Sequence, residues 1–156
     1  MADIYELSIA LNLREELSDE ELAELRWHFG LGPKPESLRI VPAFPTVVED
    51  DRGDPVMVDD PVPLLSQHGE AWKVGGALVA VLLRAEGARC GTWALTVRQE
   101  IHPDEFDRTG ELLSWLATKA DDRHRALGTV RLGWTRGCES DQFEPLVVRD
   151  GEVMWL

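Results

Sequence analysis

The residues best suited to acid/base or metal chemistry lie in one stretch, Arg98–Asp107, which reads RQEIHPDEFD and holds one histidine among four acids. Histidine beside carboxylates is the composition of a metal site or of a general acid/base pair. The same acids are also what the first turn of a helix prefers, because they face the positive end of the helix dipole. We favour a helix start and expect no metal site. His102 is the one candidate catalytic residue, since histidine is a poorer N-cap than serine or aspartate.

Two arginines offer anion-binding chemistry. Arg14 and Arg98 occupy equivalent positions near the ends of two expected strands, and two guanidinium groups that converge there can bind a carboxylate or a phosphate. The simpler interpretation, which we favour, is that each arginine pairs with the acid two residues further on, Glu16 or Glu100, or with an acid of a helix.

Glycines and polar residues surround His68 and Trp72 in the stretch SQHGEAWKVGG, Ser66–Gly76. This composition is typical of a mobile flap that contributes ligand contacts. The alternative for Trp72, which we favour, is a buried anchor of the loop, because an exposed tryptophan leaves a large apolar surface in water.

Motifs of common cofactor and metal sites are absent from the sequence. There is no GxGxxG or P-loop, no GxSxG elbow, no HExxH and no EF-hand spacing, so no cofactor is expected. The acidic stretch Glu49–Asp60 matches no calcium loop and is interpreted as a solvated turn. Cys90 and Cys138 are interpreted as two reduced thiols.

The composition excludes several classes of partner. A net charge of −13, without a basic patch, repels phosphates, so no nucleic acid partner is expected. The longest apolar run, Ala77–Leu83, is far below the ~20 residues that span a bilayer, so no membrane partner is expected. The N-terminus shows no signal-peptide pattern, which predicts a cytoplasmic location.

The elements that must position these side chains come in two similar stretches. LNLREELSDEEL (11–22) aligns with LTVRQEIHPDEF (95–106), with Leu11 over Leu95 and Arg14 over Arg98. Such self-similarity within one chain indicates an internal repeat.

In each copy an alternating strand leads into a capped helix. In the first copy Ser18 is the expected N-cap, and Glu21 completes a capping box. In the second copy His102 takes the N-cap place, and Pro103 sits at the first helical position, where its missing N–H costs nothing.

The expected order of elements continues in both halves. Each helix is followed by a short strand, Leu38–Val41 or Thr129–Trp134, and then by a hairpin, Pro45–Met57 or Pro145–Met154. An added strand is expected to precede the second copy and pair with it: Ala77–Arg84 with Thr92–Glu100. We therefore expect a single domain, 1–156, of two pseudo-repeats, about 3–58 and 77–156, joined by a Pro/Gly-rich segment, 59–76.

This order predicts an α+β fold, with two helices on one face of an antiparallel sheet. It resembles the ferredoxin-like class of α+β folds, whose pseudo-twofold halves make the first and third strands central neighbours. In that architecture, pairing of open sheet faces often encloses a ligand cavity, so the resemblance implies a site on the face away from the helices. Fold class alone does not assign a function.

The open face of the two central strands is expected to be a shallow polar floor. It carries Ser8, Ala10 and Asn12 on one strand beside Ala94 and Thr96 on the other. Asn12 and Thr96 join Arg14, Arg98, His68 and Trp72 as candidate ligand-binding residues.

Two hypotheses of function follow. The first is a non-catalytic domain that forms a homodimer, or binds a protein partner or small anionic ligand, through its open sheet face. The second is a small cofactor-free enzyme in which His102 is the acid/base and Arg98 anchors an anionic substrate. The direction of the His102 side chain, into a cavity or over its own helix, separates them.

Overall fold

The computed structural model describes residues 3–14, 17–84 and 93–155. Cys90, Thr92 and Glu16 lie outside the described residues, so the expectations for Cys90 and for an Arg14–Glu16 pair are not addressed by the structure. The expected pairing of Ala77–Arg84 with the strand that starts the second copy is confirmed, with Trp93–Ile101 as the described partner.

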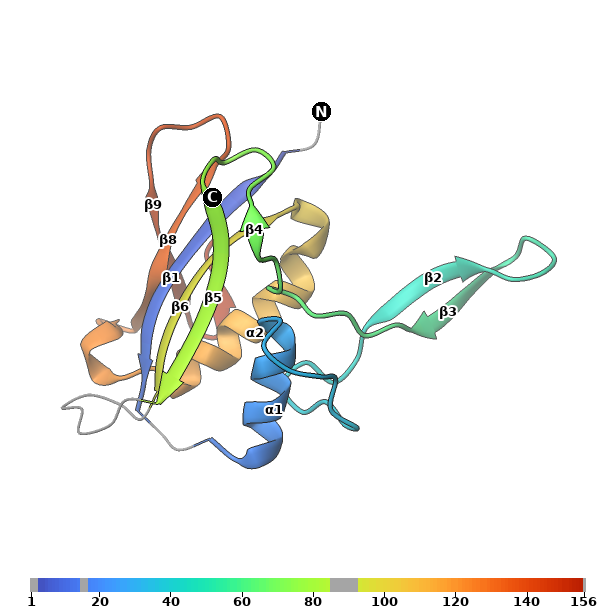
Figure 1. Cartoon of the computed structure of the whole chain (residues 1–156), viewed down its shortest axis with the longest axis horizontal. Helices are drawn as coiled ribbons and strands as arrows, with labels where there is room; N and C mark the ends of the chain where they lie inside the picture. Colours follow the sequence, from blue (N-terminus) through green and yellow to red (C-terminus); the bar gives the residue numbers. More distant parts are fainter. Residues whose placement is uncertain (1–2, 15–16, 85–92, 156) are drawn as a thin grey trace.

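One sheet of eight strands dominates the described part of the chain (Figure 1). Its order is β10-β9-β8-β1-β6-β5-β4, with β7 paired to β8, and every pair is antiparallel. The strands are β1 (Tyr5–Leu13), β4 (Gly69–Glu70), β5 (Ala77–Arg84), β6 (Trp93–Ile101), β7 (Arg125–Ala126), β8 (Thr129–Gly137), β9 (Glu144–Arg149) and β10 (Glu152–Val153).

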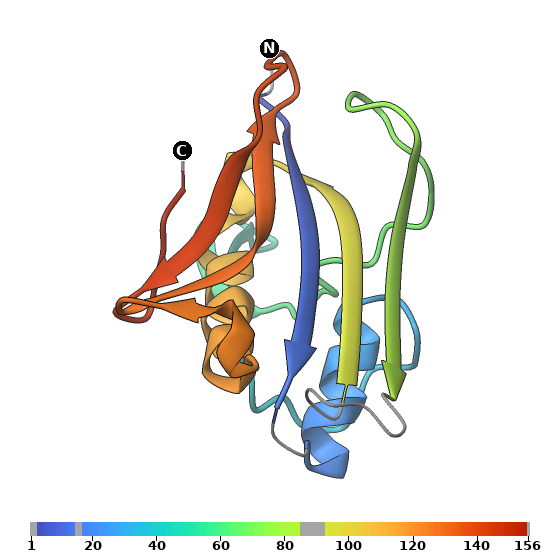
Figure 2. The same cartoon turned by 90° about the vertical axis from the view of Figure 1, so that its left-hand side faces the viewer.

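Two α-helices lie on one side of this sheet (Figures 1 and 2). They are α1 (Asp19–His28) and α2 (Phe106–Lys119), with 3-10 turns η1 (Pro103–Glu105) before α2 and η2 (Asp122–His124) after it. The expected α+β class with an antiparallel sheet is confirmed. Neither α-helix in the described part of the chain is long and apolar enough to cross a membrane.

The alternation read from the sequence sets which face is buried. Odd-numbered residues of β1 and β6 point toward the helices, and Leu11 lies directly opposite Leu95 in the antiparallel register. Against them pack Leu25 of α1 and Leu116 of α2. Each large apolar side chain buried in this way contributes about 1.5–3 kcal/mol to folding.

Both expected helix starts are present as capping boxes. The Glu21 N–H donates to Ser18 Oγ at 3.1 Å, and the Ser18 N–H donates to Glu21 Oε1 at 3.1 Å. In the second, the Asp104 N–H donates to His102 Nδ1 at 3.1 Å and the His102 N–H to Glu105 Oε1 at 3.0 Å. Asp104 and Glu105 therefore lie in a helical start, as expected from the sequence, although it is the 3-10 turn η1 and the α-helix itself begins at Phe106.

The expected strand Leu38–Val41 is wrong. The buried carboxylate of Glu24 accepts hydrogen bonds from the N–H groups of Arg39, Ile40 and Val41, at 2.5, 2.8 and 2.9 Å. Those N–H groups are then unavailable to a neighbouring strand. The segment is instead bound to the side of α1 through Glu24.

The two expected hairpins form, but they take different places. Among the described strands, β2 (Pro45–Glu49) and β3 (Pro55–Asp59) pair only with each other, and they project from the body of the molecule (Figure 1). β9 and β10, in contrast, belong to the main sheet. The structural equivalence of the two halves is therefore limited to β1, β6 and the helix starts that follow them.

Gly133 lets β8 approach β1 closely. At an irregularity of the β8–β9 pairing next to Gly133, a Cβ at this position would overlap the backbone carbonyl oxygen of Ser8. Only glycine fits such a contact between two backbones.

Candidate binding face

Within the described residues, no helix covers the side of the sheet that faces away from α1 and α2 (Figure 2). We call the outward-facing residues of β5, β6, β1 and β8 the open face. Because directly opposed residues of antiparallel strands share a face, the pairs Val81–Thr96, Thr96–Ala10 and Ser8–Trp134 place their side chains together there.

Large apolar side chains stand along the two sides of the open face. On β5 these are Val79, Val81 and Leu83, and on β8 it is Trp134; each is between 40% and 60% exposed. Between them lie the small residues of β1 and β6, which we call the floor: Ser8, Ala10, Ala94 and Thr96. The face therefore has raised apolar sides and a low centre.

A hollow of about 420 Å³ opens beside Trp134, lined by Ser8, Trp134 and Phe143. Two arginines lie against its aromatic rings: Arg131 is 5.6 Å from the Trp134 ring centre and Arg136 is 4.9 Å from that of Phe143. Cation–π contacts of this kind hold both rings in place.

One end of the open face is closed by the segment Ala71–Ala77, which we call the clasp. The Glu100 carboxylate accepts hydrogen bonds from the N–H groups of Trp72, Lys73 and Val74, at 2.6, 2.7 and 3.1 Å. The clasp is therefore fixed to β6 through its backbone.

The other side of the clasp is held by Arg98. Its Nη1 donates to the carbonyl oxygens of Gly75 and Ala77, at 2.7 and 3.0 Å. Its Nε donates to Glu6 Oε2 at 3.1 Å, and Arg136 Nε donates to Glu6 Oε1 at 3.0 Å. Glu6 is almost fully buried, so its charge is compensated where a lone carboxylate would be costly.

The expected pairing of Arg98 with Glu100 is not what forms, since Glu6 is its acidic partner. Arg14 forms an ion pair with Asp122 of η2, at 3.2 Å, in agreement with the expected pairing to an acid of a helix.

The alternative in which Arg14 and Arg98 converge on one anion is wrong. In the antiparallel register Arg98 lies opposite Ser8, six positions before Arg14 on β1. At ~3.3 Å per residue the two arginines are ~20 Å apart along the sheet, too far to share one small anion.

His102 acts as the N-cap of η1. Its Nδ1 accepts the Asp104 N–H, so this nitrogen is committed to its own helical turn. The Asp104 carboxylate oxygen, 3.3 Å from the same atom, is almost fully exposed and adds little. This is the orientation over its own helix, which favours the binding hypothesis over the enzyme.

His68 and Trp72 do not lie together over the floor as ligand contacts. His68 Nε2 is 2.8 Å from the carbonyl oxygen of Phe29, just after α1, and so ties its loop to the helix side. Trp72 is 72% exposed, with Lys73 Nζ 4.8 Å from the ring centre, so the expected buried anchor is wrong. Its backbone, in the clasp, is at the end of the open face.

Asn12 and Thr96 are on the open face, as expected. The Asn12 N–H donates to His124 Nε2 at 3.0 Å. Burial lowers the pKa of His124 below its ordinary value, Arg123 and Arg131 lower it further, and Asp121 opposes them. A neutral ring is what this acceptor role requires.

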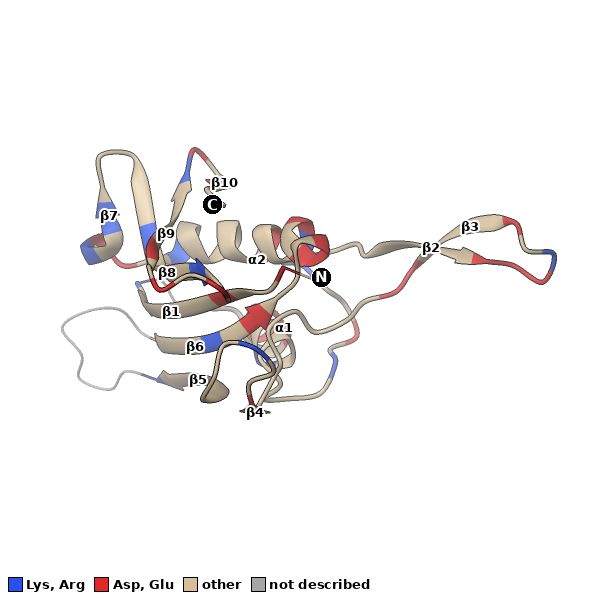
Figure 3. Cartoon of the chain, turned by 90° about the horizontal axis from the view of Figure 1, so that it is seen from above, with Lys and Arg blue, Asp and Glu red and all other residues tan. Residues whose placement is uncertain are grey.

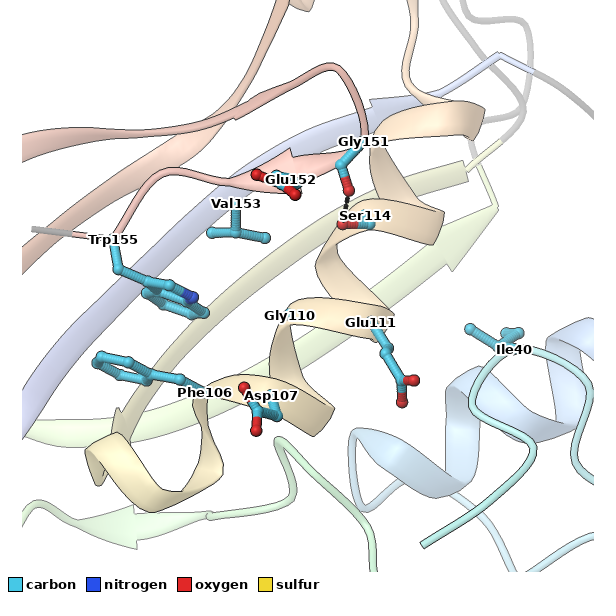
Figure 4. A pocket seen from close by; sticks show the side chains of 10 residues that line it. All are labelled: Ile40, Phe106, Asp107, Gly110, Glu111, Ser114, Gly151, Glu152, Val153 and Trp155. Atoms are coloured by element: carbon cyan, nitrogen blue, oxygen red, sulfur yellow. Dashed lines mark hydrogen bonds between the residues drawn. The ribbon is translucent and has the colours of Figure 1, made fainter.

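A second hollow, of about 570 Å³, lies between α2 and the C-terminal segment (Figure 4). Phe106 and Trp155 stack at 4.1 Å along one side, and Asp107, Glu111 and Glu152 also line it. The Ser114 hydroxyl donates to the Gly151 carbonyl oxygen at 2.8 Å, which binds the chain end to α2. Among the described residues, no group of three or more His, Cys, Asp or Glu could hold a metal ion.

The residues that shape the open face were only partly visible in the sequence. Ala77–Leu83 is a continuous apolar run, so the periodicity does not reveal that alternate side chains, such as Val81, stay exposed. Glu6 carries no sequence pattern that separates it from an ordinary surface acid.

Neither a protein-family model, nor a curated protein, nor a solved structure matches the chain.

Proposed function

We propose that the chain is a non-catalytic module that associates with another copy of itself through the open face. The observation that carries this proposal is a set of large apolar side chains left exposed on the side of the sheet that neither described α-helix covers: Val79, Val81, Leu83 and Trp134. An antiparallel sheet with one face in water normally alternates apolar and polar residues, and an apolar outer face indicates a contact surface.

The shape of the face suits a protein surface. Sheets that pack face to face do so at a spacing of about 10 Å, with side chains from both partners filling the gap. The floor residues, such as Ala10 and Thr96, are small, so side chains of a partner can enter between the taller β5 and β8 residues. Trp134 is an anchor of the kind that dominates protein interfaces.

The charged groups at the clasp end of the open face are already paired within the chain. Glu6 and Glu100 are buried and hydrogen bonded, and Arg98 and Arg136 are bound to them or to clasp carbonyls. A face whose charged groups are paired in advance avoids much of the desolvation cost of association.

The enzyme hypothesis has less support. His102 Nδ1 already accepts a hydrogen bond from its own helical turn. The Arg98 guanidinium already donates hydrogen bonds to Glu6 and to the clasp. A substrate would have to displace these bonds to use either residue. The cytoplasmic location and the alternative of a small anionic ligand stay predictions.

We also infer a ferredoxin-like core with duplicated halves. The chain order β1, α1, β5, β6, α2, β8 and the sheet order β8-β1-β6-β5 support it, because the split βαβ pattern places the first and third strands at the centre. The pairing of Leu11 with Leu95 and the two capping boxes support a shared origin of β1 and β6.

Sedimentation velocity over a wide range of protein concentration tests the proposed function. The wild-type mass should rise with concentration, and Val81→Glu should remain monomeric with an unchanged melting temperature. Leu31→Glu is the matched control, because Leu31 has a similar exposure (37% against 41%) but lies just after α1. A wild-type chain that is monomeric throughout, or a Val81→Glu variant that associates normally, would overturn the proposal.

A further inference from the structure

We propose that the open face receives the β2–β3 hairpin of a second copy, so that the chains associate head to tail. This inference rests on the self-association proposed above and names the element that occupies the face. We call the hairpin, Pro45–Asp59, the arm.

The arm exposes apolar side chains on both of its sides. Val47 lies opposite Met57 in the register, and these two are 62% and 65% exposed. The other side carries Val48, Val56 and Val58, also exposed. A two-stranded hairpin with apolar side chains in water gains little by itself, so a covering surface is expected.

The arm nevertheless has a fixed shape. At its tip, Asp50 Oδ1 accepts the N–H groups of Arg52 and Asp54, at 2.8 and 2.9 Å. At its base, Asp59 Oδ1 accepts the N–H of Phe44 at 2.7 Å. A hairpin held at both ends loses little conformational freedom on docking, which favours association.

The arm does not cover the open face of its own chain. It projects on the side of the sheet where the helices lie, away from the strands, whereas the open face looks the opposite way (Figures 1 and 2). An arm that docks on an open face must therefore come from another molecule.

Charge selects the open face among the surfaces of a second copy. The arm carries five acids and one arginine: Glu49, Asp50, Asp51, Asp54, Asp59 and Arg52 (Figure 3). Arm-to-arm pairing would bring two such acidic hairpins together. The start of α2, on the helix side, is also acidic, with Asp104, Glu105 and Asp107.

The open face, in contrast, does not repel an acidic hairpin. Its only acids on β5, β6, β1 and β8, all of them fully described, are the buried and compensated Glu6 and Glu100. Arg131, over the Trp134 ring, adds a positive charge at the β8 side. Like charges at an interface suppress association, so this difference decides where the arm can dock.

The dimensions agree with this assignment. Neighbouring strands lie ~4.8 Å apart, so β5 and β8, three strands apart, stand ~14 Å from each other, and a two-stranded arm fits between their raised side chains. The Val47–Met57 side of the arm, being the more exposed, is the side that we assign to the floor.

Such a contact uses two different surfaces of the chain. It is therefore heterologous, and repeated association closes into a ring or extends into a filament. This consequence makes the inference testable by mixing two variants, each with one surface damaged.

The arm variant is the double substitution Val47→Glu and Met57→Glu, and the face variant is Val81→Glu. All three residues are exposed, so both variants should keep the wild-type melting temperature. Met57→Glu alone changes one of the two arm side chains and should weaken self-association less than the double substitution. Each variant alone should remain monomeric at concentrations where the wild type associates, because its self-association is weakened about tenfold or more. An equimolar mixture should form a one-to-one pair, because the intact arm of one variant meets the intact face of the other.

Sedimentation velocity on the two variants and their mixture has three outcomes against the inference. If the arm variant associates like the wild type and the face variant does not, the inference fails and the proposed function stands. If each variant is monomeric and their mixture is too, the face pairs in another way and the inference again fails. If both variants associate like the wild type, the inference and the proposed function fail together.

Discussion

Arg98 Nε lies 3.1 Å from Oε2 of Glu6, across the two central strands β6 and β1. Since Arg136 reaches the same carboxylate from β8, one buried acid joins three strands and, through Arg98, the clasp. The end of the open face is built around this acid.

Glu6→Ala should lower the free energy of unfolding by about 3 kcal/mol, because it leaves two partly buried guanidinium groups without their carboxylate. Denaturant unfolding measures this. Glu70→Ala, which removes an exposed acid, is the control and should change little. Equal effects of the two substitutions would contradict the structural role of Glu6.

Glu24→Gln should lower the free energy of unfolding by about 2–3 kcal/mol, because the buried carboxylate accepts three backbone N–H groups and a bond from His28. Glu20→Gln, at an exposed position of the same helix, is the matched control. A loss no larger than that of the control would show that residues 39–41 are held in another way.

Acidification should weaken the fold through Glu24. Burial raises the pKa of this carboxyl, but hydrogen bonds from His28, Ile40, Val41 and Arg39 together lower it below its ordinary value of 4.5. The stabilisation is therefore fully present above about pH 4.5 and is lost as the pH falls through the lowered folded-state pKa. Unfolding free energies measured down this range should fall more steeply for the wild type than for Glu24→Gln.

His124 should add a separate step, at higher pH, to the dependence of folding stability on pH. Its folded-state pKa is lowered from 6.5, chiefly by burial, so the unfolded chain binds a proton more readily. Stability is present above pH 6.5 and is lost as the pH falls below it toward the folded-state pKa. In His124→Gln this step should vanish. A wild-type stability that stays constant through this window would contradict the neutral acceptor role toward Asn12.

Gly133→Ala should destabilise the fold by about 3 kcal/mol, since the new Cβ would meet backbone atoms of Ser8 and Ile9 that have no room to move. Gly137→Ala on the same strand is the control, because nothing lies within 4 Å of its Cβ position. Thermal unfolding of both variants separates a steric effect from a general intolerance of alanine in β8.

Local patterns predicted what depends on neighbours in the chain. The alternation of β1 and β6 set the buried face, and Ser18 and His102 began helical turns. The failures involve distant partners. The sequence of Leu38–Val41 predicted a strand, but in the structure its N–H groups donate to Glu24, which belongs to another element.

The error over Arg14 and Arg98 has a geometric cause. Positions that match along the sequence are brought together by an antiparallel pairing only near its centre, where Leu11 meets Leu95. Matched residues further from that point, such as the two arginines, lie toward opposite ends of the β1–β6 pairing. The exposure of Val81 was hidden for a different reason, because nothing in its apolar run distinguishes a covered side from an open one.

The most direct test of self-association through the open face is the reactivity of a thiol placed on it. Val81→Cys, in a chain with Cys90→Ser and Cys138→Ser, should react more slowly with a thiol reagent as protein concentration rises, because association buries the position. Leu31→Cys in the same background should react at one rate throughout. A Val81→Cys thiol whose reactivity is the same at every concentration would contradict the central claim.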